Sequence, residues 1–143
     1  MSTELPHRSF DPVRAAALDA IIKIEEGSDT NDAVNAATAG KDLRPLDMRF
    51  LLQLVNGTTK MRRRLDFEIK FYLAKPSQKQ QPHLANILRL GFYQLLFTDK
   101  IPDAAAVSES VNLAHKFVDP SQAKLVNAVM RSEERRVGKE CRL

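Results

Sequence analysis

The sequence has no tryptophan, a single cysteine and only five glycines among its 143 residues. The lone thiol, Cys141, excludes an internal disulfide and a cysteine-rich zinc site. None of the three histidines lies at metal-ligand spacing from another. The few glycines provide few turns, which argues against a many-stranded sandwich. We therefore predict a mainly helical chain without a metal centre.

Long apolar runs are also missing. No segment approaches the 18 or so residues of a membrane span, and the opening MSTELPHRSF lacks the apolar core of a signal peptide. A cytoplasmic protein without membrane contact is the expectation. Hydrophobic residues make up 43% and charged residues 28%, which is typical of one globular domain. The net charge of +4 permits nucleic-acid binding without requiring it.

Apolar residues recur at helical spacing through the first half of the chain. The first predicted helix has its N-cap at Asp11, followed by a proline at the first helical position, and it ends at Gly27. A shorter helix is predicted over about 30–38. A single long helix is predicted over 45–72, and we expect a kink or a close contact at Gly57.

The second half begins after the loop LAKPSQKQQP, whose two prolines divide the chain. Further helices are predicted from Pro82, from Asp103 and from about Leu125. The helix from Pro82 has the cleanest 3.6-residue period in the sequence and is expected at the centre of the core, with Gly91 on its apolar stripe. The sequence therefore predicts about six to seven helices in two halves and no strand.

The helical pattern stops after Arg131. We interpret the charged residues 132–143 as vector-derived read-through or a frayed native extension, and we leave them out of the functional reasoning. The polar residues 1–10 are expected to be flexible. The predicted organisation is therefore one helical domain over residues 11–131, with a short segment on either side.

Two blocks of the second half carry a resemblance to a known family: ILRLGFYQLLFTDKIPDAAAVSESVNLAHKF and LVNAVMR. Together with PLDMRFLLQLVNGTTKMRRRLDFEI, they resemble the NusB-like all-helical domain over almost all of residues 11–131. That domain occurs in the antitermination factor NusB and at the N-terminus of ribosomal RNA 5-methylcytosine methyltransferases of the Sun/Fmu type. The resemblance implies an all-α fold, a compact orthogonal bundle.

Several positions are more similar to the methyltransferase branch of this family. They are the arginine-rich run before LDFEI, the LAKP after it, Gln94 and Ala128, where the antitermination factor usually has Glu and Gly. Asn56 departs from the family pattern, which commonly has Tyr there. The resemblance thus implies an RNA-binding N-terminal domain whose partners are ribosomal RNA and a methyltransferase domain in the same polypeptide.

Catalysis is not expected from this chain alone. A methyltransferase of this type needs a glycine-rich turn for S-adenosylmethionine and a cysteine nucleophile. The glycines form no such array, and Cys141 lies in the stretch already set aside. Glu109 and His115 are six positions apart on different helical faces, without a nucleophile. We expect no cofactor here, and S-adenosylmethionine only in the catalytic domain outside this chain.

The densest charge feature comprises Lys60, Arg62, Arg63 and Arg64. Cations this close repel one another, and either phosphates or acidic side chains relieve the repulsion. Arginine forks also match phosphate oxygens in pairs. RNA contact, surface ion pairs, contact with the catalytic domain and a plainly solvated face all stay open for this cluster.

A second basic set, Arg8 and Arg14, lies around the start of the first helix. The resemblance nominates Arg14 for RNA binding, because antitermination relatives use arginines at this position, and an exposed helix arginine is the alternative. Asn127 lies in an apolar helix and is expected to be buried, tying two helices together. The aromatic residues could form base-stacking platforms, but we expect core packing for them, with Tyr93 the first candidate for an exception. They are Phe67, Phe71, Tyr72, Phe92, Tyr93 and Phe97.

Three functions follow from these patterns. The first is the RNA-binding N-terminal domain of a ribosomal RNA methyltransferase, which would hold RNA for chemistry performed elsewhere. The second is an antitermination factor that binds a short RNA element together with a ribosomal protein. The third is a structural domain that packs on a neighbour or forms a homodimer through helix faces, without contact to RNA.

Overall fold

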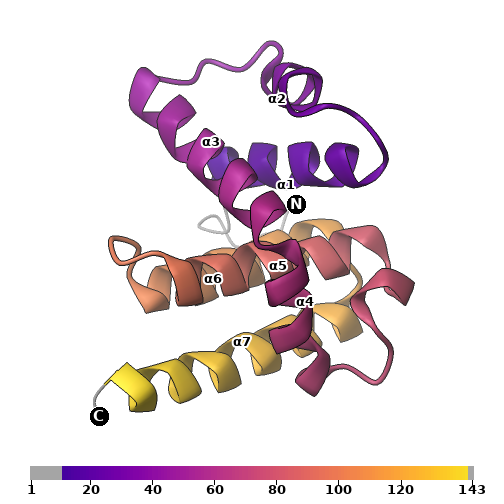
Figure 1. Ribbon diagram of the computed structural model, residues 1–143, viewed down its shortest axis with the longest axis vertical. Helices are drawn as coiled ribbons and strands as arrows, with labels where there is room; N and C mark the ends of the chain where they lie inside the picture. The colour runs from indigo at the N-terminus through magenta and orange to yellow at the C-terminus, as the bar shows by residue number, and fades with distance from the viewer. Residues whose placement is uncertain (1–10, 142–143) are drawn as a thin grey trace, which may run out of the picture.

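The structure, a computed structural model, describes residues 11–141, and these residues contain no β-strand (Figure 1). The all-α prediction is therefore confirmed for this part of the chain. In order, the elements are α1 (Pro12–Glu25), α2 (Thr30–Thr38), α3 (Pro45–Lys60), α4 (Arg62–Ile69), η1 (Lys70–Tyr72), η2 (Ser77–Lys79), α5 (Pro82–Phe97), α6 (Asp103–Phe117) and α7 (Pro120–Cys141).

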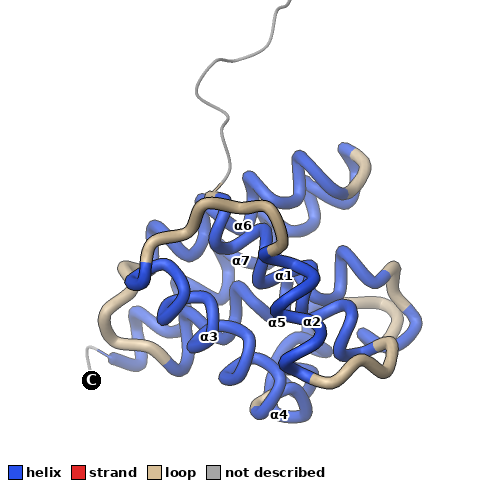
Figure 2. Tube along the Cα trace, turned by 90° about the horizontal axis from the view of Figure 1, so that it is seen from above, coloured by secondary structure: helices blue, strands red, loops and turns tan. Residues whose placement is uncertain are grey.

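The helices form two groups, and α5 belongs to the second group and also contacts the first. The helices α1, α2 and α3 lie together at the top of Figure 1, and α5, α6 and α7 lie below them. Helix α5 packs against α1, α3, α4, α6 and α7, so it is the central helix that its sequence period predicted. Figure 2 shows the same arrangement from above, with loops only between the helices.

Local sequence explains where the first helices begin and end. The Asp11 side chain accepts a hydrogen bond of 2.9 Å from the Val13 N–H, and Asp29 caps α2 in the same way. Prolines occupy the first helical position of α1, α3 and α5, where the missing N–H costs nothing. Gly27 follows α1 with a φ of 113°, a conformation that favours glycine.

Two glycines inside helices allow close packing, and this was expected for Gly57. A Cβ atom at Gly57 would lie 2.1 Å from Cζ of Tyr93, so α3 touches α5 through a bare backbone. A Cβ atom at Gly91 would lie 2.6 Å from Oγ of Ser110 and 2.7 Å from Cε of Met130. The absence of a side chain at these positions thus brings α3 onto α5, and α5 onto α6 and α7.

The single long helix predicted over 45–72 is wrong. Helix α3 ends at Lys60, and α4 begins at Arg62 after a turn at Met61, whose φ and ψ are −94° and 10°. The break therefore lies four positions beyond Gly57, which makes a close contact instead. The apolar spacing continues across the turn into the buried Leu65, so periodicity alone does not reveal the change of direction.

The helix that was expected to stop after Arg131 continues to Cys141 as α7. Glu133 is buried there and accepts a hydrogen bond of 2.8 Å from the hydroxyl of Tyr72. Burial and this carboxylate raise the pKa of Tyr72 to about 12. The interpretation of 132–143 as vector-derived stays a prediction, because a helix over these residues is compatible with either origin.

Candidate nucleic-acid interface

The basic cluster lies where α3 turns into α4. Lys60 is the last residue of α3, and the three arginines form the first turn of α4, so the bend at Met61 places all four cations at one corner of the molecule. Lys60, Arg63 and Arg64 are exposed and Arg62 is half-buried. Three of the four, all but Arg64, line a shallow depression of about 410 Å³ together with Thr59 and Asp66.

Two of these four cations are neutralised. Arg62 Nη2 lies 3.0 Å from Glu25 Oε2, and Arg64 Nη2 lies 2.9 Å from Glu68 Oε2. Lys60 and Arg63 form no salt bridge with any residue between 11 and 141. The cluster thus presents two positive charges whose repulsion no carboxylate in the described structure relieves, and which are available to an anion.

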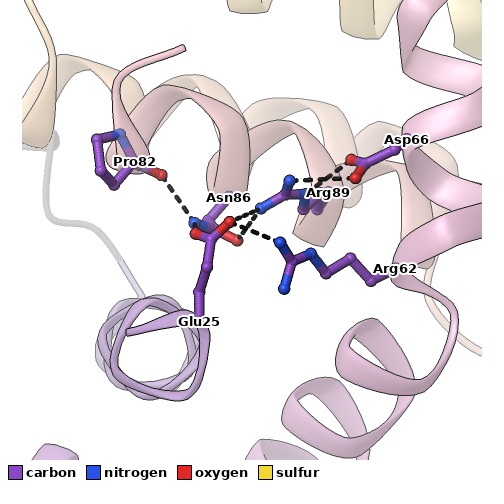
Figure 3. A network of polar contacts seen from close by, with 6 residues as sticks. All are labelled: Glu25, Arg62, Asp66, Pro82, Asn86 and Arg89. Atoms are coloured by element: carbon purple, nitrogen blue, oxygen red, sulfur yellow. Dashed lines mark hydrogen bonds and ion pairs between the residues drawn. The ribbon is translucent and has the colours of Figure 1, made fainter. Parts of the chain in front are cut away.

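A buried polar network fixes the cluster to the rest of the protein (Figure 3). At its centre is Arg89 of α5, whose side chain is only 1% exposed. Its Nε and Nη2 donate to the two carboxylate oxygens of Asp66 on α4, at 2.8 and 3.1 Å, and its Nη1 donates to Glu25 Oε2 at 2.9 Å. A single guanidinium therefore joins α5 to α4 and to the end of α1.

Asn86 completes the network one turn before Arg89. Its Nδ2 donates to Glu25 Oε1 at 2.8 Å and to the carbonyl of Pro82 at 2.9 Å, and its Oδ1 accepts from Arg89 Nη1 at 2.9 Å. Arg62 lies at the outer edge of the network. The two carboxylates, of Glu25 and Asp66, are therefore balanced by two guanidiniums, of Arg62 and Arg89. The network is therefore neutral and hydrogen-bonded, which is the condition under which charges can be buried.

Ionisation of the network follows from this pairing. Burial by itself would raise the pKa of Glu25, but hydrogen bonds from Asn86 and Arg89 and the charges of Arg89 and Arg62 outweigh it and leave that pKa below its usual value. Burial likewise opposes the charge on Arg89, yet Asp66 and Glu25 raise its pKa overall. Both groups are therefore charged at neutral pH.

The outer face of α4 and η1 carries aromatic rings that the sequence analysis assigned to the core. Phe67 is 49% exposed and Phe71 is 68% exposed, and their rings meet edge to face at 5.5 Å. Lys70 Nζ lies 4.3 Å from the first ring centroid and 5.4 Å from the second. The core assignment is therefore wrong for these two residues and for the exposed Phe97, and correct for Phe92 and Tyr93.

Arg14 does not match either expectation for it, because it is buried with only 8% of its surface exposed. Its Nε donates to Gln94 Oε1 at 2.8 Å, its Nη1 lies 2.6 Å from Asp11 Oδ2, and its guanidinium lies over the Phe50 ring. These contacts commit Arg14 to holding α1 against α3 and α5. Arg8, which was predicted with it, lies outside the described residues.

Asn127 also differs from expectation. It is half-buried, and its Oδ1 accepts a hydrogen bond of 3.0 Å from Arg131 on the same helix, so it does not tie two helices together. It lines a shallow groove between α6 and α7. Buried amides that do link elements are those of Asn86 and Gln94. The sequence signal for Asn86 was its place three positions before Arg89, in the otherwise apolar stretch NILRLGF.

The described part of the chain offers neither a membrane span nor a metal centre. No helix there is both long and apolar enough for a bilayer. No group of three His, Cys, Asp or Glu side chains in that part of the chain has the arrangement of a metal site. The basic corner and the aromatic face beside it are therefore the features that most need a functional explanation.

The family model that matches is that of the NusB family, over residues 11–135. A probable ribosomal RNA small subunit methyltransferase B from Bacillus subtilis (strain 168) is 36% identical over 86% of this chain and 28% of its own length. A protein of the same name from Synechocystis sp. (strain ATCC 27184 / PCC 6803 / Kazusa) is 37% identical over 74% of this chain and 24% of its own length. The chain thus spans about a quarter of the curated relatives it matches.

Solved structures resemble the fold. A crystal structure of antitermination factors NusB and NusE in complex with dsRNA superimposes with a TM-score of 0.77 at 20% identity, covering 87% of this chain and 94% of that one. A structure of T. maritima NusB gives 0.76 at 20% identity, covering 93% of both chains. The sequence match and the shared helical architecture agree, and the chain belongs to the NusB family.

Proposed function

We propose that this chain is the RNA-binding N-terminal domain of a ribosomal RNA 5-methylcytosine methyltransferase. It would hold ribosomal RNA in the cytoplasm for a catalytic domain that binds S-adenosylmethionine and lies outside this chain. The higher identity to the methyltransferases than to NusB structures, 36% against 20%, supports this branch over a free-standing antitermination factor. The NusB–NusE complex with dsRNA supports RNA as the ligand class.

The observation that carries the proposal is the distribution of charge at the basic corner. The acidic neighbours that could neutralise it are already engaged, because Asp66 pairs with the buried Arg89 and Glu68 pairs with Arg64. Lys60 and Arg63 therefore face solvent without a salt bridge in the described structure. Both cations line one depression, and cations without a carboxylate partner attract phosphates, whose binding releases condensed counterions from the nucleic acid.

The proposed contacts differ from those expected at the sequence level. Lys60 and Arg63 would bind phosphates directly, whereas Arg62 and Arg64 would keep their own carboxylates and add little net charge. Arg8 stays a proposed phosphate contact, and Arg14 does not, because its guanidinium is committed inside the protein. Binding through phosphates would be mostly electrostatic and only weakly sequence-specific.

The test is the salt dependence of binding to a structured fragment of small-subunit ribosomal RNA. Affinity should fall steeply with salt, and Lys60→Ala with Arg63→Ala should flatten the slope of log affinity against log salt by about 1 to 2. Arg49→Ala, which removes an exposed arginine from α3, is the matched control and should leave the slope unchanged. A wild-type slope near zero would contradict the proposal and favour the structural or homodimeric alternative.

A further inference from the structure

A stripe of exposed residues continues from the basic corner along the outer face of α4 into η1. We call it the α4 stripe, and its members, spaced mostly by three and four positions, are Lys60, Arg63, Phe67, Lys70 and Phe71. Arg63 and Phe67 are four positions apart and share one side of α4. Lys60 lies across the bend, at the end of α3, and lines the same depression as Arg63. Lys70 in η1 lies over the rings of Phe67 and Phe71. The structure thus places three cations and two aromatic rings on one continuous exposed surface.

The charge of this surface has one sign. Asp66 and Glu68, the carboxylates of α4, are engaged with Arg89 and Arg64, and their side chains are 15% and 13% exposed. None of the three lysines and arginines of the α4 stripe makes a salt bridge within the described residues. Lys75, in the loop after η1, and Lys79, at the end of η2, are also exposed. The partner that complements this surface is a polyanion.

The exposed rings of Phe67 and Phe71 indicate which kind of polyanion fits this surface. A bare phosphate backbone gains nothing from an exposed phenyl ring, whereas an unpaired base can stack on it. The rings of Phe67 and Phe71 are almost perpendicular, with an interplanar angle of 88°. Neighbouring bases in a duplex are parallel, so bases that stack on both rings must be splayed apart. This geometry fits a single-stranded segment and does not fit a helix.

We propose that the α4 stripe binds an unpaired segment of RNA, with bases on Phe67 and Phe71 and phosphates at Lys60, Arg63 and Lys70. This rests on the function proposed above and deepens it by naming the class of RNA. Lys70 now lies over both rings. Its long stem allows the ammonium to move to a phosphate, which is a stronger partner than a ring, and this movement uncovers the ring face for a base.

Tryptophan fluorescence tests the contact directly. The chain contains no tryptophan, so Phe67→Trp introduces a single indole on the stripe. A mixed-sequence single-stranded RNA of about 12 nucleotides should quench it, and an abasic strand of the same length should not. Leu46→Trp, at an exposed site 64% accessible on α3, is the control and should not be quenched. Equal quenching at both sites, or by the abasic strand, would overturn the proposal.

Affinities separate stacking from charge. The double substitution of Phe67→Leu with Phe71→Leu should weaken binding of the single strand about tenfold and leave duplex affinity and the salt slope unchanged. Phe67→Trp should bind as tightly as wild type. Both changed positions are exposed, and a circular dichroism spectrum checks that the variants are folded. Unchanged single-strand affinity in the double variant would overturn the proposal and leave the rings as a contact for another protein domain.

The same titrations separate this proposal from the one on which it rests. If wild type binds neither RNA, both fall. If it binds single strand and duplex equally and with a steep salt slope, RNA binding stands and the role of the two rings in stacking is wrong. The proposal for the α4 stripe is supported only if two results are found together. The wild type must bind the unpaired RNA more tightly than the abasic strand, and the double variant Phe67→Leu with Phe71→Leu must lose this difference in affinity.

Discussion

Arg89 and Asp66 join α5 to α4 through two parallel hydrogen bonds inside the protein. Asp66 follows the basic cluster by two positions, so the pair fixes the helix turn on which Arg62, Arg63 and Arg64 lie. It also engages a carboxylate that lines the same depression as Arg63. One buried interaction therefore both positions the candidate interface and leaves its charge positive.

Replacing Arg89 should test this connection. Arg89→Met keeps an apolar stem of similar length but leaves Asp66 and Glu25 without their central partner, which should destabilise the fold by about 3 kcal/mol, because both carboxylates retain some access to water. Urea unfolding at neutral pH measures the change. Arg44→Met, at an exposed arginine, is the control. A loss of under about 1 kcal/mol at Arg89 would show that the network does not hold α4.

Acid should weaken the same network. The pKa of Glu25 is lowered in the folded protein from a reference value of 4.5, so its contribution to stability is complete above that value and is lost as the pH falls through the folded pKa. The free energy of unfolding should therefore be flat near neutral pH and decline below about pH 4.5.

Two variants show which carboxylate causes the loss of stability at low pH. Glu25→Gln should lower stability at neutral pH and make the acid limb shallower, because the neutral amide no longer exchanges a proton. Asp47→Asn removes a half-buried surface carboxylate whose pKa is also lowered, through a hydrogen bond from Arg44, and it should change the limb less. Urea unfolding between about pH 3 and 7 gives both curves. Identical limbs in wild type and Glu25→Gln would exclude Glu25 as their source.

The contact between Gly57 and Tyr93 makes a prediction about packing. A methyl group at Gly57 would overlap the Tyr93 ring, which is itself buried, so Gly57→Ala should cost about 1–3 kcal/mol although alanine favours helices. Gln53→Ala, one turn earlier at an exposed position, should be nearly neutral. Thermal or urea unfolding compares them. A Gly57→Ala variant more stable than wild type would mean that α3 and α5 separate without penalty.

The sequence was sufficient for what depends on local pattern. Caps, prolines and periodicity located the helices, and the family blocks indicated the bundle. It was insufficient where partners lie far apart in the chain. Glu25 and Arg89 are 64 positions apart, and no spacing rule connects them. Periodicity indicates which face of a helix is apolar, but it does not show that an arginine is drawn into that face or that Phe67 and Phe71 are left outside.

Arg14 shows the same limit and gives the last prediction. At the sequence level it was nominated for RNA, yet its guanidinium is engaged with Asp11, Gln94 and the ring of Phe50. Arg14→Ala should therefore lower the free energy of unfolding by about 1–3 kcal/mol, because the buried Gln94 carbonyl loses its charged donor.

RNA binding by the folded Arg14→Ala protein should have the wild-type salt slope, since a cation that is already neutralised releases no counterions from the nucleic acid. Arg63→Ala should give the opposite result, with unchanged stability and a slope flatter by about 1. Unfolding curves and RNA titrations on the two variants supply all four values. A flatter slope for Arg14→Ala would return the start of α1 to the RNA interface and weaken the case for α4.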